Sequence, residues 1–162
     1  MRVDLLEHHR PITTAALQQM LGFQQNPTGK DRTHPSVTFD NVLKGKLGEA
    51  AWALKLGFGL DAILDDGPNR PDFVDPEGRS LDVKCAKLDQ RWINVRSYYL
   101  KDAFADWTIL AALCDVPTFT VELVGSLPAS RLWEYPVSRP ASGHSTEYIS
   151  VPTDAFDTAG LT

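Results

Sequence analysis

The residues best suited to chemistry lie in one stretch of the sequence, RPDFVDPEGRSLDVKCAK, at positions 70–87. It contains two acids, Asp72 and Asp82, and a lysine, Lys84. Asp82 and Lys84 are two residues apart, so in a β-strand their side chains share one face, while the alternating apolar residues share the other. Carboxylate oxygens are ligands that Mg²⁺ prefers, and a neighbouring ammonium can neutralise an anionic phosphate. The stretch therefore has the residue types of a metal-dependent site that acts on phosphate groups.

The position of Asp72 depends on how this stretch turns. Segment 75–79, DPEGR, is rich in turn-forming residues and predicts a β-hairpin with Glu77 at its tip. Folding about Glu77 places Asp72 opposite Asp82, where two carboxylates repel each other and a divalent cation between them would reverse the sign of the interaction. A slip of one residue would turn Asp72 to the other face. The register of the hairpin therefore decides whether the two acids form a site.

The composition is that of an ordinary globular protein. The chain has 162 residues, of which 43% are hydrophobic and 23% charged, which fits one domain with a sizeable core. No apolar run approaches the ~18 residues of a membrane-spanning helix, and the N-terminus does not resemble a secretory signal, so we expect a cytoplasmic protein. Cys85 and Cys114 lack the spacing of a zinc site and predict reduced, buried thiols.

The charge is unevenly distributed along the chain. A net charge of −5 argues against binding nucleic acid by bulk attraction. Residues 102–162 hold two basic and eight acidic residues, whereas residues 84–101 hold five basic residues and one acid, Asp89. Such a basic strip can bind phosphates, although a solvated surface is the plainer interpretation. Its aromatic residues are Trp92, Tyr98 and Tyr99. They are candidates for stacking on bases, but Trp92 and one tyrosine fit a buried position in a following helix better.

The strongest predicted helix covers residues 38–57. Apolar residues recur along it at steps of three and four, Thr38 or Asp40 can cap its start, and Gly57 marks its end. Glu49 lies on the flank of the apolar stripe. Glycines at 45 and 48 lower the helix propensity, which indicates a close backbone approach either to another element or to a ligand.

The other elements follow from shorter patterns. Alternation, apolar runs and turn residues predict an α/β chain with a single domain. We expect a helical N-terminal addition (1–36), a core (38–124) and a C-terminal extension with extra strands (125–162). The predicted elements are helices at 3–22, interrupted at Pro11, and within 88–103; strands at 58–64, 72–75, 80–86, 106–113, 118–124 and 148–151; a short helical segment near 128–132; a turn at 65–69; and loops at 22–36 and 136–145.

These residues, in this order, resemble a known family. Glu49 on a helix, Pro71-Asp72 on one hairpin strand and Asp82-Val83-Lys84 on the next resemble the PD-(D/E)xK nuclease superfamily. The segment 44–49, KGKLGE, is similar to the helix start of archaeal Holliday-junction resolvases. The likeness covers about residues 40–113. It implies a restriction-endonuclease-like αβββαβ core, with a mixed β-sheet flanked by helices.

The resemblance implies a role for each matching residue. Asp72 and Asp82 would bind Mg²⁺, or Mn²⁺ in its place, together with the backbone carbonyl of Val83. Glu49 would complete the site as a ligand or through water. Lys84 would position the attacking water and neutralise the scissile phosphate. The predicted DNA contacts are Lys44, Lys46, Lys87, Arg91 and Arg96.

The resulting prediction is a divalent-metal-dependent DNA nuclease, with endonuclease action on branched or otherwise structured DNA favoured. Many enzymes of this superfamily are dimers, which leaves a homodimer open. Two alternatives stay open. One is a nuclease-fold module that binds nucleic acid or a protein partner without cutting, and the other is an α/β accessory protein in which the acids are ordinary surface residues.

Overall fold

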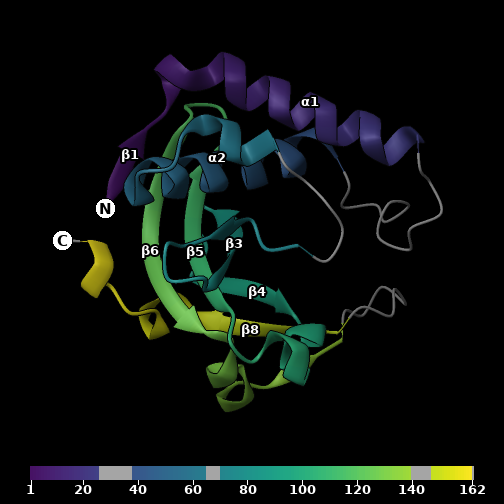
Figure 1. The fold of residues 1–162 in the computed structure, drawn as a ribbon, viewed down its shortest axis with the longest axis vertical. Coiled ribbons are helices and arrows are strands. Elements are labelled where there is room, and N and C mark those ends of the chain that lie inside the picture. Colours follow the sequence, from purple (N-terminus) through teal and green to yellow (C-terminus); the bar gives the residue numbers. More distant parts are fainter. Residues whose placement is uncertain (26–37, 65–69, 140–146, 162) are drawn as a thin grey trace.

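The computed structural model describes residues 1–25, 38–64, 70–139 and 147–161. It is an α/β structure with a mixed five-stranded sheet, helices on one face of that sheet and a small three-stranded sheet on the other (Figure 1). The helices are α1 (His9–Gln25) and α2 (Phe39–Leu56); the large sheet contains β1 (Arg2–Asp4), β2 (Phe73–Val74), β3 (Ser80–Lys87), β5 (Thr108–Asp115) and β6 (Thr120–Pro128); the small sheet contains β4 (Trp92–Arg96), β7 (Val137–Ser138) and β8 (Tyr148–Pro152).

The large sheet has the strand order β1-β6-β5-β3-β2, and the small sheet has the order β4-β8-β7. Only β3 and β5 run parallel, and the other neighbours are antiparallel. Along β5, Leu110 and Ala112 are buried against the helices, whereas Ile109 and Ala111 are buried against the small sheet. Burial on both faces explains why residues 106–113 form a nearly continuous apolar run, and the predicted central strand is confirmed.

Helix α2 follows the prediction closely. The Thr38 hydroxyl accepts a hydrogen bond from the Asn41 N–H at 3.2 Å, and the helix ends at Gly57 in the left-handed conformation. The Trp52 indole donates to the Ala111 carbonyl at 3.2 Å, where the register between β5 and β6 shifts. This contact fixes α2 across the middle of the sheet.

Gly48 accounts for the close backbone approach that the sequence indicated. A Cβ at this position would lie 2.1 Å from the Cys85 sulfur and 3.3 Å from atoms of both Ala112 and Val83. Gly45 meets nothing within 4 Å. Of the two glycines, Gly48 is therefore the one that lets α2 pack directly against β3 and β5.

The hairpin has the register that the turn sequence predicted. Phe73 pairs with Leu81 and Val74 with Ser80, which is the pairing obtained by folding about Glu77. The Gly78 N–H donates to the Asp75 carbonyl at 2.9 Å, and Gly78 has a φ of 81°. A type I turn followed by one left-handed residue is a common three-residue hairpin loop, and glycine adopts that last conformation without strain.

Two predicted elements of the core are wrong. Residues 60–64 form a 3₁₀ helix instead of a strand, because a short apolar run cannot by itself distinguish the two. Within 88–103, the residues 92–96 form a strand and 97–100 a 3₁₀ helix, where we predicted a loop and a helix. The side chains along β4 alternate, so Trp92 is 54% exposed, and the prediction that it is buried is also wrong.

The two ends of the chain also differ from the prediction. Arg2–Asp4 pairs with β6 as a strand, and α1 includes Pro11 in its first turn, where the N–H groups have no partner within the helix. At the other end, β8 supplies the buried Ile149 and Val151 to the core beneath the small sheet. The boundary expected at residue 124 falls inside β6. The turn at 65–69 and most of the loops at 22–36 and 136–145 lie outside the described residues.

No helix in the described ranges has the length and apolar character needed to span a membrane.

Gly48→Ala should destabilise the protein by about 1–3 kcal/mol, because the new methyl group overpacks the contact with β3 by more than the gain in helix propensity. Gly45→Ala is the matched control, since it makes the same change in open space and should stabilise by about 0.5–1 kcal/mol. Urea unfolding of both variants measures the difference. Adding Cys85→Ala to Gly48→Ala should recover part of the loss, and equal effects of the two glycine substitutions would contradict the packing argument.

Candidate functional site

The candidate site begins where the hairpin ladder ends. The Val83 N–H donates to the Asp72 Oδ2 at 2.6 Å, at the point where the paired register would bring Pro71 opposite Val83. Within a strand, the N–H and C=O of one residue point to the same side. Proline has no N–H to donate to the Val83 carbonyl. The Asp72 carboxylate and the Val83 carbonyl therefore lie at the same unpaired edge of β3.

Asp82 and Lys84 lie on the face of β3 that packs toward the small sheet. They pair with Ile109 and Ala111 of β5, which belong to that core. Asp82 is 5% exposed, and the Lys84 Nζ lies 2.5 Å from its Oδ2. This Oδ2 accepts no well-aligned hydrogen bond from any described residue. Lys84 is therefore the cation that compensates this buried carboxylate oxygen.

Tyr99 is a site residue that the sequence did not identify. It is buried in the 3₁₀ helix after β4, its hydroxyl interacts with the Asp82 carboxylate, and the Lys84 Nζ lies 5.0 Å from its ring centroid. Burial, and then the charge of Asp82, raises the pKa of Tyr99 above its usual range. Tyr98 stacks on Tyr99 with ring centroids 4.5 Å apart and is 39% exposed. The pair of tyrosines within the basic strip was the only signal in the sequence.

The two acids influence each other. Two effects raise the pKa of Asp72 from 3.8 to about 7: first its burial, and second the negative charge of the Asp82 carboxylate. Lys84 opposes this shift, as do the Val83 N–H and Lys46. Burial lowers the pKa of Lys84, but the charges of Asp82 and Asp72 raise it by more, so the pKa of Lys84 lies above its usual value. Lys84 is therefore a fixed positive charge and is poorly suited to act as a general base.

Glu49 is held on the helix side of the sheet by Lys46. The Lys46 Nζ donates to the Glu49 Oε2 at 2.7 Å and to the Ile63 carbonyl at 2.8 Å. Lys46 is fully buried, so the prediction that it contacts DNA is wrong in this conformation. The positive charge of Lys46 also lowers the pKa of Asp72. Lys46 therefore interacts both with Glu49 and with the hairpin acid Asp72.

The donor set suits a small hard cation only in part. Among the described residues, no three His, Cys, Asp or Glu side chains lie close enough together to hold a metal ion. Glu49, Asp72 and Asp82 therefore do not form a ready three-acid cluster. Mg²⁺ often binds one or two carboxylates and completes its shell with water and substrate phosphate. Asp72, Asp82 and the Val83 carbonyl fit that smaller set, and the Asp82 Oδ2 is the atom whose burial a cation would compensate.

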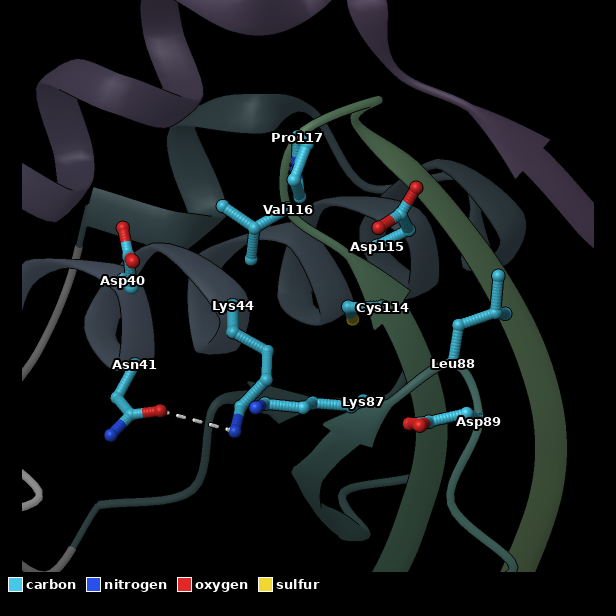
Figure 2. A pocket seen from close by; sticks show the side chains of 10 residues that line it. All are labelled: Asp40, Asn41, Lys44, Lys87, Leu88, Asp89, Cys114, Asp115, Val116 and Pro117. Atoms are coloured by element: carbon cyan, nitrogen blue, oxygen red, sulfur yellow. Dashed lines mark hydrogen bonds between the residues drawn. The ribbon is translucent and has the colours of Figure 1, made fainter.

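The predicted DNA contacts separate into two groups. Lys44 and Lys87 line one cavity beside the start of α2, on the helix side of the sheet (Figure 2). Arg91 precedes β4 in the small sheet and is exposed, whereas Arg96 is the last residue of β4 and is half-buried. The basic strip of the sequence is therefore divided between two surfaces of the fold.

Asp72→Asn should change the pH dependence of stability. In the wild type, the Asp72 carboxyl ionises near pH 3.8 in the unfolded chain and near pH 7 in the folded protein. The folded state therefore loses stability as the pH rises between these two values. The variant should therefore be more stable than the wild type at pH 8, by about 1–3 kcal/mol for this half-buried group, and nearly equal to it at pH 4. Thermal unfolding in EDTA at both pH values measures this.

Asp75→Asn is the matched control, with the opposite sign. Hydrogen bonds from Arg79, first from its backbone N–H, lower the pKa of Asp75, so this substitution should reduce stability at pH 8. A stability difference between the wild type and Asp72→Asn that does not depend on pH would contradict the assignment.

Comparisons with protein-family models, with curated proteins and with solved structures found no match for this chain. The functional argument therefore depends on the residues themselves: the two hairpin acids, Lys84 with Tyr99 beneath it, and the separate lysine cavity.

Proposed function

We propose that this protein is a divalent-metal-dependent nuclease that hydrolyses phosphodiester bonds in DNA. One observation carries the proposal: Asp72 and Asp82 meet at the end of the hairpin, one with a pKa raised to about 7 and the other with a buried oxygen that lacks an aligned donor. Two carboxylates placed together at a cost in stability are typical of a site that binds a cation. A structural hairpin has no need of the second acid.

The finer fold assignment is part of the same proposal. A restriction-endonuclease-like core is supported by a glutamate-bearing helix, then an antiparallel hairpin with the acids, and then a strand parallel to the second hairpin strand. The chain departs from the expected αβββαβ order at residues 60–64 and 92–96. In this proposal, the connection between β3 and β5 contains the strand β4 in place of a helix.

The proposed chemistry assigns a role to each group. The bound metal would supply a water of lowered pKa and polarise the phosphoryl oxygen. Asp72, Asp82 and the Val83 carbonyl would hold it. Lys84, kept charged by the two acids, would turn toward the scissile phosphate once a cation takes its place beside Asp82. Tyr99 would keep Asp82 and Lys84 in position through its hydroxyl and its ring.

One observation favours the second candidate, a nuclease-fold module that binds DNA without cutting. Glu49 forms an ion pair with buried Lys46, and Asp82 with Lys84, so lysines already compensate two of the three acids. Catalysis requires that at least the second pair opens when metal and substrate bind. The two candidates therefore differ in whether metal displaces Lys84 from Asp82.

Purified protein should nick supercoiled plasmid DNA in Mg²⁺ or Mn²⁺ and be inactive in EDTA. Asp82→Asn should lower the rate by at least about 100-fold, because it removes a metal ligand while leaving the fold intact. Asp154→Asn, an exposed acid far along the chain, is the matched control and should cut normally. Cleavage in EDTA, or normal cleavage by Asp82→Asn, would make the proposal wrong. Binding of plasmid, single-stranded or branched DNA without cleavage of any of them would favour the binding module.

Arg91→Ala combined with Arg96→Ala should weaken DNA binding and reduce its salt dependence. Each lost phosphate contact lowers the slope of log K against log salt by about 0.9 on duplex DNA, so the pair should lower it by up to about 2. Arg2→Ala with Arg10→Ala removes two exposed arginines near the N-terminus, where β1 forms the opposite edge of the large sheet, and is the control. Equal slopes for the two double variants would leave Arg91 and Arg96 as ordinary surface residues.

A further inference from the structure

The cavity lined by Lys44 and Lys87 lies apart from the hairpin acids. It has a volume of about 390 Å³ and lies where the carboxyl ends of the parallel strands β3 and β5 approach the start of α2 (Figure 2). Lys87 is five residues beyond Asp82, about 16 Å along the strand, and its side chain points to the opposite face. None of Asp72, Asp82 or Lys84 lines this cavity.

Two lysines from different elements converge in the cavity. Lys44 extends from α2 and Lys87 from the end of β3, and both side chains line this cavity (Figure 2). The Lys44 Nζ donates to the neutral Asn41 Oδ1 at 3.3 Å. In the described part of the chain, neither ammonium forms an ion pair with a carboxylate. Two uncompensated positive charges in one cavity favour an anion between them.

The acids that line the cavity do not neutralise these lysines. The Asp115 carboxylate accepts a hydrogen bond from the Thr118 hydroxyl at 2.5 Å. The Asp40 carboxylate points away from the two amino groups in Figure 2. Asp89 is exposed, as Lys87 is, and forms no ion pair with either lysine in the described part of the chain. The first turn of α2 adds partial positive charge at the same end of the cavity.

We infer that this cavity binds a phosphate monoester, with the phosphate between Lys44 and Lys87. Two lysines match the charge of a phosphate dianion, and lysine binds phosphate as a point charge. The volume is within the range of sites for small organic ligands, and Leu88 and Val116 offer apolar walls for the attached group. The ligand is either a free mononucleotide or the phosphorylated end of a nucleic-acid strand, and the second source depends on the proposed nuclease function.

The test is a binding measurement on the full chain in EDTA, so that no cleavage occurs. Isothermal titration with thymidine 5′-monophosphate should show binding, and thymidine without phosphate should bind at least about tenfold more weakly. Lys44→Gln and Lys87→Gln should each weaken monophosphate binding by about tenfold, since each removes one charge at nearly constant length. Lys55→Gln, at the other end of α2, is the matched control and should bind as the wild type does.

Asp89→Asn gives a test of sign. Removing this acid should strengthen monophosphate binding by a few-fold if the cavity is an anion site, and weaker binding would overturn the inference. Absence of monophosphate binding by the wild type, or binding that both lysine variants leave unchanged, would also overturn it. Circular dichroism of each variant establishes that it is folded.

Two oligonucleotides of one sequence, with a 5′-phosphate or a 5′-hydroxyl, distinguish the sources. Tighter binding of the phosphorylated strand, lost in Lys87→Gln, supports the strand end. Equal binding of both strands, together with lysine-dependent monophosphate binding, supports the free nucleotide. If the protein binds monophosphate but never cleaves DNA, the cavity inference holds and the nuclease proposal is wrong. If it cleaves DNA but does not bind monophosphate, the nuclease proposal holds and the cavity inference is wrong.

Discussion

The hydrogen bond from the Val83 N–H to the Asp72 carboxylate is the contact on which the candidate site depends. At 2.6 Å it takes the place of a ladder bond at the end of the hairpin, and it brings a titratable carboxyl group to a position that a backbone carbonyl would ordinarily occupy. Pro71 at this point leaves the Val83 carbonyl without a ladder donor. The proline and the aspartate together therefore end the strand pairing and create an edge rich in oxygen atoms.

Burial makes the negative charges of the two acids at this edge unfavourable. β3 lies between the helices and the small sheet, so Asp82 and Lys84 point into a region packed with Tyr99 and its aromatic neighbours. Lys84 relieves the charge of Asp82 only by approaching closely, and Asp72 stays neutral up to about pH 7. The same packing that orders the site therefore keeps two carboxylates close together in a buried region, at a cost in stability.

Local patterns predicted the parts of this arrangement that depend on neighbouring residues. The turn DPEGR determined the hairpin register, and caps at Thr38 and Gly57 determined α2. Contacts that depend on distant residues were not predictable. Lys46 is buried because Ile63 offers a carbonyl, and Tyr99 joins the site because β4 departs to a second sheet. Neither spacing nor composition carries that information, since both depend on which strands pair.

The small sheet has a consequence for how the molecule folds. β4 pairs with β8 across a long separation, as shown by Asn94 and Ser150, which are 56 residues apart. The hairpin with both acids closes locally and can form early, whereas such distant pairing closes a large loop and forms late. Tyr99 follows β4 directly. Asp72 and Asp82 should therefore come together before Tyr99 packs beside Asp82. The repulsion between the two carboxylates then arises early in folding, and the contact that orders them forms late.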